Sequence, residues 1–488
     1  MTGCLMQLAA YGAQDVYLTG DPMITHFKTV YRRHTNFAME TIEQSFNGSV
    51  DFGTTVSAII SRNGDLINGA YIQATLPDLA GSSDTTVNRW TENVGHHLIK
   101  QVEVEIGGQL IDRHYGEWLD IWSQLTVPAG KQTGYNLMIG QGRPDALGRP
   151  TGPQKDVDVG MVIGQPVYIP LNFWFCRNVG LALPLIALQY HTVKINVTFA
   201  ELSDLVRTET TLGTSRLTGV KLWLDYIYLD VEERKKFSQT AHEYLIEQVQ
   251  FNGGQLCEAN MSRYDTTTQR VNLNFNHPVK ELVWVAQPVN YLTGNNRQPS
   301  NYTAIIGQAP ANQTDDLIDS LTSLSVITLM NDIKQLNQSS IKPPGALNPV
   351  ISAKLTLNGH DRFTTQTGDY FNLLNPMRYH TNIPISPGIN VYSFGVKPED
   401  IQPSGSCNFS RIDNAYLTLG LATLQSSSQS AEYPDSLEIT VKADGTEVIA
   451  GTSITPLYAS SSVNVKVYAV NYNVLRIMNG LGGVAFTN

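Results

Sequence analysis

Apolar and polar residues alternate along several short stretches of the 488-residue chain. This period of two is typical of β-strands that bury one face and expose the other. Clusters of Gly, Pro and Asn separate the stretches, which favours antiparallel sandwiches or barrels with long surface loops. The clearest strands are predicted at residues 102–106, 193–199, 222–230, 354–357 and 463–468.

Helical periodicity is scarce. Residues 115–125 have a near-helical spacing of tryptophan, leucine and isoleucine, so a short helix is predicted there. Two long stretches rich in polar residues, Gly and Pro are predicted to be surface loops. Loops of this length are uncommon unless they are functional. They cover residues 127–159 in the first half of the chain and about 290–349 in the second half.

One order of features occurs twice, roughly half a chain apart: a strand, a glycine turn, Asp-Arg, and then Gly, an acid and an aromatic residue. The repeat predicts two similar domains in tandem. The charged run at residues 231–237 lies near mid-chain and is the predicted boundary, which gives an N-terminal segment (1–25), a first domain (26–236) and a second domain (237–488). The two copies contain Gly107-Gly108, Asp112-Arg113 and Gly116-Glu117-Trp118, and Asn358-Gly359, Asp361-Arg362 and Gly368-Asp369-Tyr370.

Composition narrows the possible functions. Charged residues make up only 16 % of the chain and the net charge is −10, so no direct nucleic-acid binding is expected. A small basic cluster (Lys28, Arg32, Arg33 and His34) is interpreted as a solvated or inter-subunit surface. The four cysteines are scattered, which indicates neither a disulfide framework nor a zinc site. We expect no signal peptide, because the N-terminus lacks a basic segment followed by an apolar core.

Motifs that carry catalytic or metal chemistry are incomplete. His242-Glu243 begins like a zinc-protease helix, but Ile246 stands where the second histidine is needed. Residues 156–160 resemble a calcium loop without its full set of ligands. His96-His97 and the nearby His114 are interpreted as structural histidines, because neighbours on a strand point to opposite faces. We therefore predict no metal site and no cofactor.

Paired carboxylates are the most serious enzymatic alternative, since two such groups in a cleft hydrolyse glycosidic bonds. The candidate pairs are Glu103 with Glu105, and Glu117 with Asp120. Neither pair is distinguished by its surroundings in the sequence, and exposed strand carboxylates are the favoured interpretation. No catalytic residue is predicted.

Candidate modification sites follow from Asn-x-Ser/Thr triplets, the acceptor pattern for N-glycosylation. Three of them, Asn301, Asn312 and Asn337, lie in the predicted excursion and are the possible glycosylation sites. Because no signal peptide is predicted, modification by the secretory pathway is not expected.

Several longer segments resemble the major capsid proteins of nucleocytoplasmic large DNA viruses, particularly those that infect algae. They run from one end of the chain to the other, and only the two long loops depart from the family pattern. The segments lie at residues 11–20, 27–33, 61–67, 106–118, 242–248, 402–413, 469–477 and 480–483.

This resemblance implies an all-β fold of two tandem eight-stranded antiparallel jelly-roll barrels with long loops and a few short helices. It also implies a structural role and not an enzymatic one: a homotrimer with a pseudo-hexameric outline that tiles an icosahedral shell. The implied partners are neighbouring capsomers, minor capsid and penton proteins, and an internal membrane near residues 1–25. The implied location is the virion, after assembly in the host cell. The alternative is a carbohydrate-binding or carbohydrate-active jelly-roll protein.

Overall fold

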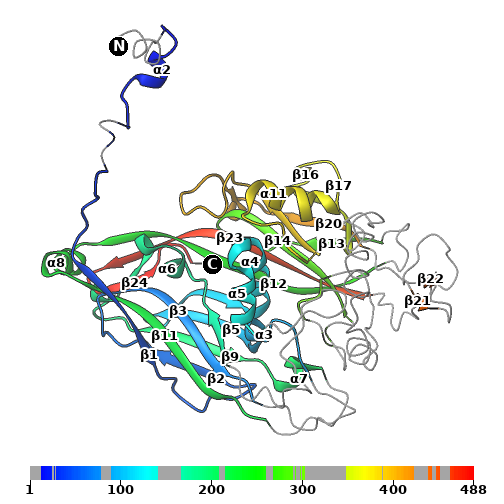
Figure 1. Ribbon diagram of the computed structural model, residues 1–488, viewed down its shortest axis with the longest axis horizontal. Helices are drawn as coiled ribbons and strands as arrows, with labels where there is room; N and C mark the ends of the chain where they lie inside the picture. The colour runs from blue at the N-terminus through cyan, green and yellow to red at the C-terminus, as the bar shows by residue number, and fades with distance from the viewer. Residues whose placement is uncertain are drawn as a thin grey trace.

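Two β-barrels lie side by side in the computed structural model, and an N-terminal arm reaches away from them (Figure 1). Short helices lie between and around the barrels. The structure describes residues 12–24, 27, 29–77, 89–140, 166–207, 215–259, 267–289, 292, 297, 299–302, 348–386, 388–421, 438–441, 447–450 and 462–487.

The first barrel consists of two antiparallel sheets, A1 and B1. Early strands pair with late ones: β1 with β11 and β2 with β9, as in a jelly roll. Sheet A1 has the order β1 (Phe37–Gln44), β11 (Thr218–Leu229), β3 (Leu66–Thr75) and β7 (Pro166–Pro170), with β8 (Leu183–Pro184) beside β3. Sheet B1 has the order β2 (Thr55–Ile59), β9 (Val193–Phe199), β5 (Ile99–Ile106) and β6 (Gln109–Tyr115).

The second barrel repeats this strand order in sheets A2 and B2. The all-β prediction and the two tandem jelly rolls are confirmed. The number of eight strands per barrel stays a prediction, because short extra strands lie beside the main ones. Sheet A2 has the order β12 (His242–Glu258), β23 (Ser462–Met478), β14 (Pro278–Pro288) and β18 (Ile389–Ser393), with β19 (Cys407–Asn408) beside β14 and β24 (Leu481–Val484) beside β23. Sheet B2 has the order β13 (Thr267–Asn272), β20 (Ala415–Leu421), β15 (Val350–Leu357) and β16 (His360–Asp361), with β17 (Gln366–Thr367) beside β15.

The remaining elements are short. Two small ribbons pair β4 (Arg89–Trp90) with β10 (Val206–Arg207) and β21 (Glu438–Val441) with β22 (Glu447–Ala450). The helices are α2 (Val16–Thr19), α3 (Val94–Leu98), α4 (Gly116–Thr126), α5 (Ala129–Met138), α6 (Trp174–Arg177), α7 (Leu202–Leu205), α8 (Val231–Gln239), the π-helix η5 (Tyr370–Leu374), α11 (Asn375–Tyr379), and the 3-10 turns η1 (Val179–Leu181), η2 (Leu185–Ala187) and η6 (Phe409–Arg411).

Each barrel has its own hydrophobic core, and the long strand β23 takes part in both. Val465 and Val467 at its start pack in the core of the second barrel. Leu475 and Ile477 near its end pack in the core of the first barrel, together with Ile246 of β12. The two cores therefore share strands, and the barrels are joined by more than a linker.

The repeated sequence pattern occupies the same place in both barrels. Gly107-Gly108 and Asn358-Gly359 form the β5–β6 and β15–β16 turns, and all four residues have positive φ angles that favour Gly and Asn. A side chain on Gly116 would collide with the carbonyl oxygen of Ile99, the first residue of β5. A side chain on Gly368 would collide with Val350, the first residue of β15. In each barrel, therefore, the glycine allows the backbone to pass close to the first residue of the neighbouring strand.

Two sequence predictions need correction or qualification. The predicted loop at residues 127–159 begins with helix α5, although its two glycines weaken the helical pattern. The charged run near mid-chain is helix α8, between β11 and β12. Residues 141–159, with the calcium-like segment, and most of 290–349 lie outside the described residues.

Replacing Gly116 with Ala is expected to destabilise the protein by about 1–3 kcal/mol, the usual cost of overpacking. Gly130→Ala in α5 is the matched control, because a Cβ there meets nothing within 4 Å. Chemical denaturation of both variants measures the difference. Equal stabilities for the two variants would contradict the close approach at Gly116.

Candidate functional site at the interface between the two barrels

Helix α4 is the element of the first barrel that faces the second. Its apolar residues Trp118, Ile121, Trp122 and Leu125 recur at positions i, i+3, i+4 and i+7, which places them on one face. Leu119 points the other way and packs in the core of the first barrel. The predicted helix at residues 115–125 is confirmed, and α4 contacts both barrels.

The outer face of sheet A2 receives this helix. Trp118 lies 5.3 Å from Tyr468 and 5.4 Å from Trp122, measured between ring centroids. Burying each large apolar side chain contributes on the order of 2 kcal/mol. The apolar contact comprises Trp118, Ile121, Trp122 and Leu125 of α4 with Val249, Val283, Val285, Tyr302, Ile389, Val391, Tyr468 and Val470.

Polar contacts fix the first turn of α4 on the sheet. The carboxylate of Glu117 lies 2.7 Å from the ammonium of Lys466 and accepts a 2.8 Å hydrogen bond from the Tyr468 hydroxyl. Burial, and then the negative charge of Glu117, raise the pKa of Tyr468 well above its usual range. The phenol therefore stays protonated and donates to Glu117 at any physiological pH.

A second polar contact surrounds the fully buried carboxyl of Asp120. It accepts hydrogen bonds from Asn93 (2.8 Å) and from the hydroxyl of Tyr302 (3.2 Å), and His96 lies 3.6 Å away. Burial alone would raise the pKa of Asp120, but the close imidazole of His96 and the charges of both neighbouring histidines lower it. The neighbouring His97 contacts Ser300 at 2.8 Å, and burial lowers its pKa to about 4.

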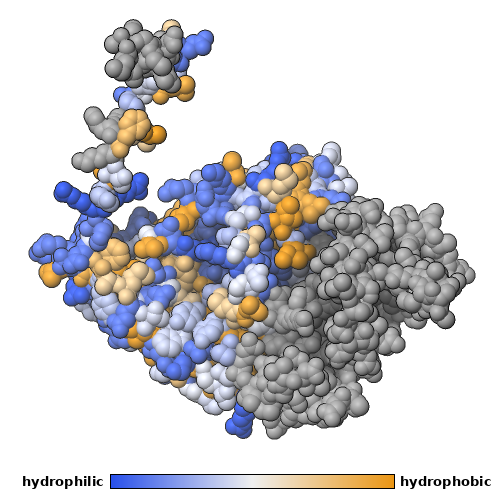
Figure 2. All heavy atoms as spheres, in the orientation of Figure 1, coloured by the Kyte–Doolittle hydropathy of each residue, from blue (hydrophilic) through white to orange (hydrophobic). Residues whose placement is uncertain are grey.

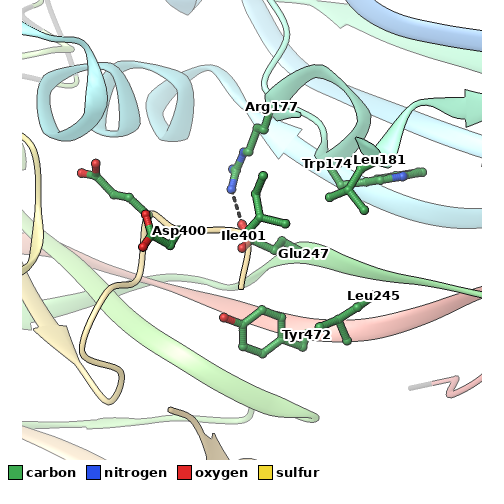
Figure 3. Close-up of a pocket in the computed structure, with 9 residues that line it drawn as sticks. Trp174, Arg177, Leu181, Leu245, Glu247, Asp400, Ile401 and Tyr472 are labelled. Carbon is green, nitrogen blue, oxygen red and sulfur yellow. Dashed lines mark hydrogen bonds and ion pairs between the residues drawn. The ribbon is translucent and has the colours of Figure 1, made fainter. Parts of the chain in front are cut away.

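A cluster of charged residues lies beside α4, at one end of the interface. Arg177 of α6 and Lys280 of β14 both contact Glu247 of β12 at 2.5 Å, one on each carboxylate oxygen. Burial lowers the pKa of Lys280, while Glu247 and Glu281 oppose that shift. Figure 3 shows Arg177 reaching from the first barrel toward Glu247, across a cavity of about 160 Å³. The guanidinium also stacks 4.4 Å above the Trp122 ring.

The buried His380 extends this cluster within the second barrel. Its two ring nitrogens lie 3.1 Å from Glu281 and 2.9 Å from Glu399. Burial alone would lower its pKa, but the charges and hydrogen bonds of these two carboxylates outweigh burial and raise the pKa to about 9. His380 is therefore protonated at neutral pH. The site as a whole is a set of paired charges, and some of these pairs connect the two barrels.

The contacts described above join the two barrels of one chain to each other. Two family models together cover almost the whole chain: "Major capsid protein N-terminus" at residues 25–230 and "Large eukaryotic DNA virus major capsid protein" at residues 233–483. The chain belongs to the major capsid proteins of large eukaryotic DNA viruses. This is a family of structural proteins and not of enzymes.

Relatives and solved structures agree with this assignment. The major capsid proteins of Phaeocystis pouchetii virus and Paramecium bursaria Chlorella virus 1 are 42 % and 41 % identical, each covering 100 % of both chains. The crystal structure of PBCV-1 VP54, fitted into a reconstruction of the virophage Sputnik, matches with a TM-score of 0.71 and 35 % identity over 95 % of this chain and 100 % of that one. The Faustovirus major capsid protein, at 14 % identity over 97 % and 96 % of the two chains, shares the fold with a TM-score of 0.62.

The four carboxylates considered as two catalytic pairs have separate structural partners in this capsid protein. Glu103 contacts Arg113 at 2.6 Å, and Glu105 lies 3.9 Å from Lys194. Glu117 and Asp120 were predicted to be exposed; that prediction is wrong, because both serve the inter-barrel contact. The signal that could have found their role was the apolar stripe of α4 beside them.

The histidines considered as metal ligands are also distributed among structural contacts. His96 and His97 lie on helix α3 and not on a strand. His114 on β6 pairs with Asp112 at 2.9 Å, and His242 contacts the carbonyl oxygen of Phe237 at 2.7 Å. Among the described residues, no group of three or more His, Cys, Asp or Glu side chains is arranged to hold a metal ion. No helix in that part of the chain is long and apolar enough to cross a membrane.

The structure describes one of the three candidate glycosylation sites. Asn301 is half-buried, its carbonyl accepts a 3.1 Å hydrogen bond from Gln287, and the next residue, Tyr302, is fully buried. Asn312 and Asn337 lie outside the described residues.

Lys280→Met is expected to destabilise the capsid protein by about 3–5 kcal/mol, because removing one partner of a buried ion pair leaves the other uncompensated. Lys397→Met is the control, since the pair of Lys397 with Asp400 is exposed and contributes about 0–1 kcal/mol. Urea denaturation followed by tryptophan fluorescence measures both. A loss for Lys280→Met no larger than the control would refute the buried pair.

His380 gives the stability a dependence on alkaline pH. Its pKa is about 9 in the folded chain and about 6.5 when unfolded, so its contribution is complete below pH 6.5 and is lost as the pH rises through 9. Stability measured from pH 6 to 10 should fall, and His380→Gln should flatten this limb.

His97→Gln is the control for this pH series. Because the pKa of His97 is lowered to about 4, its titration costs stability as the pH falls below 6.5, and its removal should leave the alkaline limb intact. An alkaline limb that persists unchanged in His380→Gln would rule out the assignment to His380.

Proposed function

We propose that three copies of this major capsid protein form a homotrimer with a pseudo-hexameric outline. The observation that supports it most strongly is the repeated strand order, β1-β11-β3-β7 in one barrel and β12-β23-β14-β18 in the other. Three chains with two similar barrels each present six similar walls, and closed symmetric rings are the common form of oligomers. The proposed division is residues 26–236 for the first barrel and 237–488 for the second, joined within α8.

In this proposal the trimers tile an icosahedral shell and contact neighbouring capsomers, minor capsid proteins and penton proteins. The N-terminal arm supports a role at the inner face, because Tyr17, Met23 and Phe27 are each more than 90 % exposed on it. Figure 1 shows the arm standing clear of both barrels. Apolar side chains on an extended arm favour contact with other proteins or with an internal membrane.

Two further parts of the proposal concern assembly and modification. We propose that the chain is made and assembled inside the host cell. Asn301, Asn312 and Asn337 remain proposed glycosylation sites, and no direct contact with nucleic acid is proposed. Mass spectrometry of peptides from virions would detect a glycan at each site.

Light scattering during gel filtration should give three times the chain mass of 53.8 kDa. Dilution until the trimer dissociates should change the tryptophan and tyrosine fluorescence, because aromatic residues concentrate at large interfaces. A chain that stays monomeric at every concentration, with constant fluorescence, would argue against the proposed trimer.

A further inference from the structure

The segment η5–α11 of the second barrel is the counterpart of helix α4. Each lies at one of the matched glycines, Gly116 and Gly368, and in both an acid and then an aromatic residue follow the glycine. Leu119 of α4 packs in the core of the first barrel, and Phe371, at the same distance from its glycine, packs in the core of the second. The two segments therefore match from their glycines as far as Leu119 and Phe371; beyond that point η5 is π-helical where α4 is α-helical, and later residues correspond by their order along the segment.

The apolar stripe of α4 has an equivalent that the described residues cover only in part, because Tyr370 packs against the second core. Counting from the glycines, Trp118, Ile121, Trp122 and Leu125 correspond to Tyr370, Leu373, Leu374 and Met377. The α4 stripe is buried against sheet A2. In the second stripe, Leu374 is 40 % exposed and Met377 is 68 % exposed. Figure 2 shows hydrophobic side chains gathered on the surface over α11.

The outer faces of sheets A1 and A2 also correspond residue by residue. The pairing register shifts at the same point in both sheets. In A1 the shift lies between Asp225 and Tyr226 of β11, and in A2 it lies between Val470 and Asn471 of β23. Aligning these shifts places Lys221-x-Trp223 of β11 on Lys466-x-Tyr468 of β23. The same alignment places Tyr71 of β3 on Val283 of β14.

The matched face of A1 carries aromatic residues that lie partly open to solvent. Tyr71 stacks on Trp223 at 6.3 Å and lies 6.4 Å from Tyr168, which is 38 % exposed. We call Tyr71, Tyr168, Lys221 and Trp223 the A1 aromatic face. In A2 the equivalent surface is fully buried under α4.

The charges repeat as well. Glu117 in the first turn of α4 pairs with Lys466 of A2. Its counterpart is Asp369, and one of its carboxylate oxygens, Oδ1, is buried without a hydrogen-bond partner among the described residues. The counterpart of Lys466 is Lys221, which lies half-exposed on the A1 aromatic face and pairs with Glu43 at 2.8 Å within its own chain.

We infer that the η5–α11 segment of one copy docks on the A1 aromatic face of a second copy, repeating between chains the contact that α4 makes within one chain. This inference rests on the proposed trimer and names the surfaces that close it. Leu374 and Met377 contact Tyr71, Tyr168 and Trp223 in this arrangement. Each copy gives one segment and receives one, so three copies close a ring of six barrels.

The test introduces a charge on each side of the contact. Met377→Asp and Tyr168→Asp should each lower the mass in gel filtration with light scattering three-fold, from trimer to monomer. Leu256→Asp is the matched control, because Leu256 is 67 % exposed on β12, outside both surfaces, and should remain trimeric. Circular dichroism of each variant establishes that it is folded.

A second measurement does not depend on disrupting the contact. A chain carrying Met377→Cys and Tyr168→Cys should form disulfide-linked trimers on non-reducing gels, whereas Leu256→Cys with Tyr168→Cys should not. If wild-type protein is trimeric while both aspartate variants stay trimeric and the cysteine pair does not cross-link, the inference is wrong and the trimer stands. If wild-type protein is monomeric, the proposed function itself fails.

Discussion

The burial of both faces of sheet A2 is the constraint from which most of the structure follows. The inner face of this sheet lines the core of the second barrel, and its outer face lies under α4. Every residue of β14 from Val279 to Pro288 is consequently buried, Lys280 and Glu281 included. Charges in such a strand persist only when they are paired, and Glu247, Arg177 and His380 provide the partners.

Strand prediction from the sequence succeeded where the two faces of a strand differ in burial. Residues 193–199 alternate cleanly and form β9 from end to end, because one face of β9 lines the first core while the other is half-buried. The strand β14 gives no such signal, since burial on two faces replaces alternation with the continuous apolar run at residues 282–286. Helix α5 escaped prediction because Gly130 and Gly134 lower its helical propensity.

The inter-barrel site could be predicted only in part. The stripe on α4 is local, so its four apolar positions are visible in the sequence. Its polar partners are not, because Glu117 and Lys466 lie 349 residues apart and nothing in either segment indicates the other. The repeat around Gly116 and Gly368 was visible, and the shared close approach of these glycines gives it a physical cause.

The strand shared by the two cores has a consequence for how the chain is synthesised. Strand β23 occupies residues 462–478, so it is synthesised after the other strands of sheets A1, B1, A2 and B2 except β24. Until then the first barrel lacks Leu475 and Ile477, and the second lacks the central strand of sheet A2. Neither barrel can complete its core before β23 has been synthesised, and a nascent chain must keep two unfinished apolar interiors from aggregating until then.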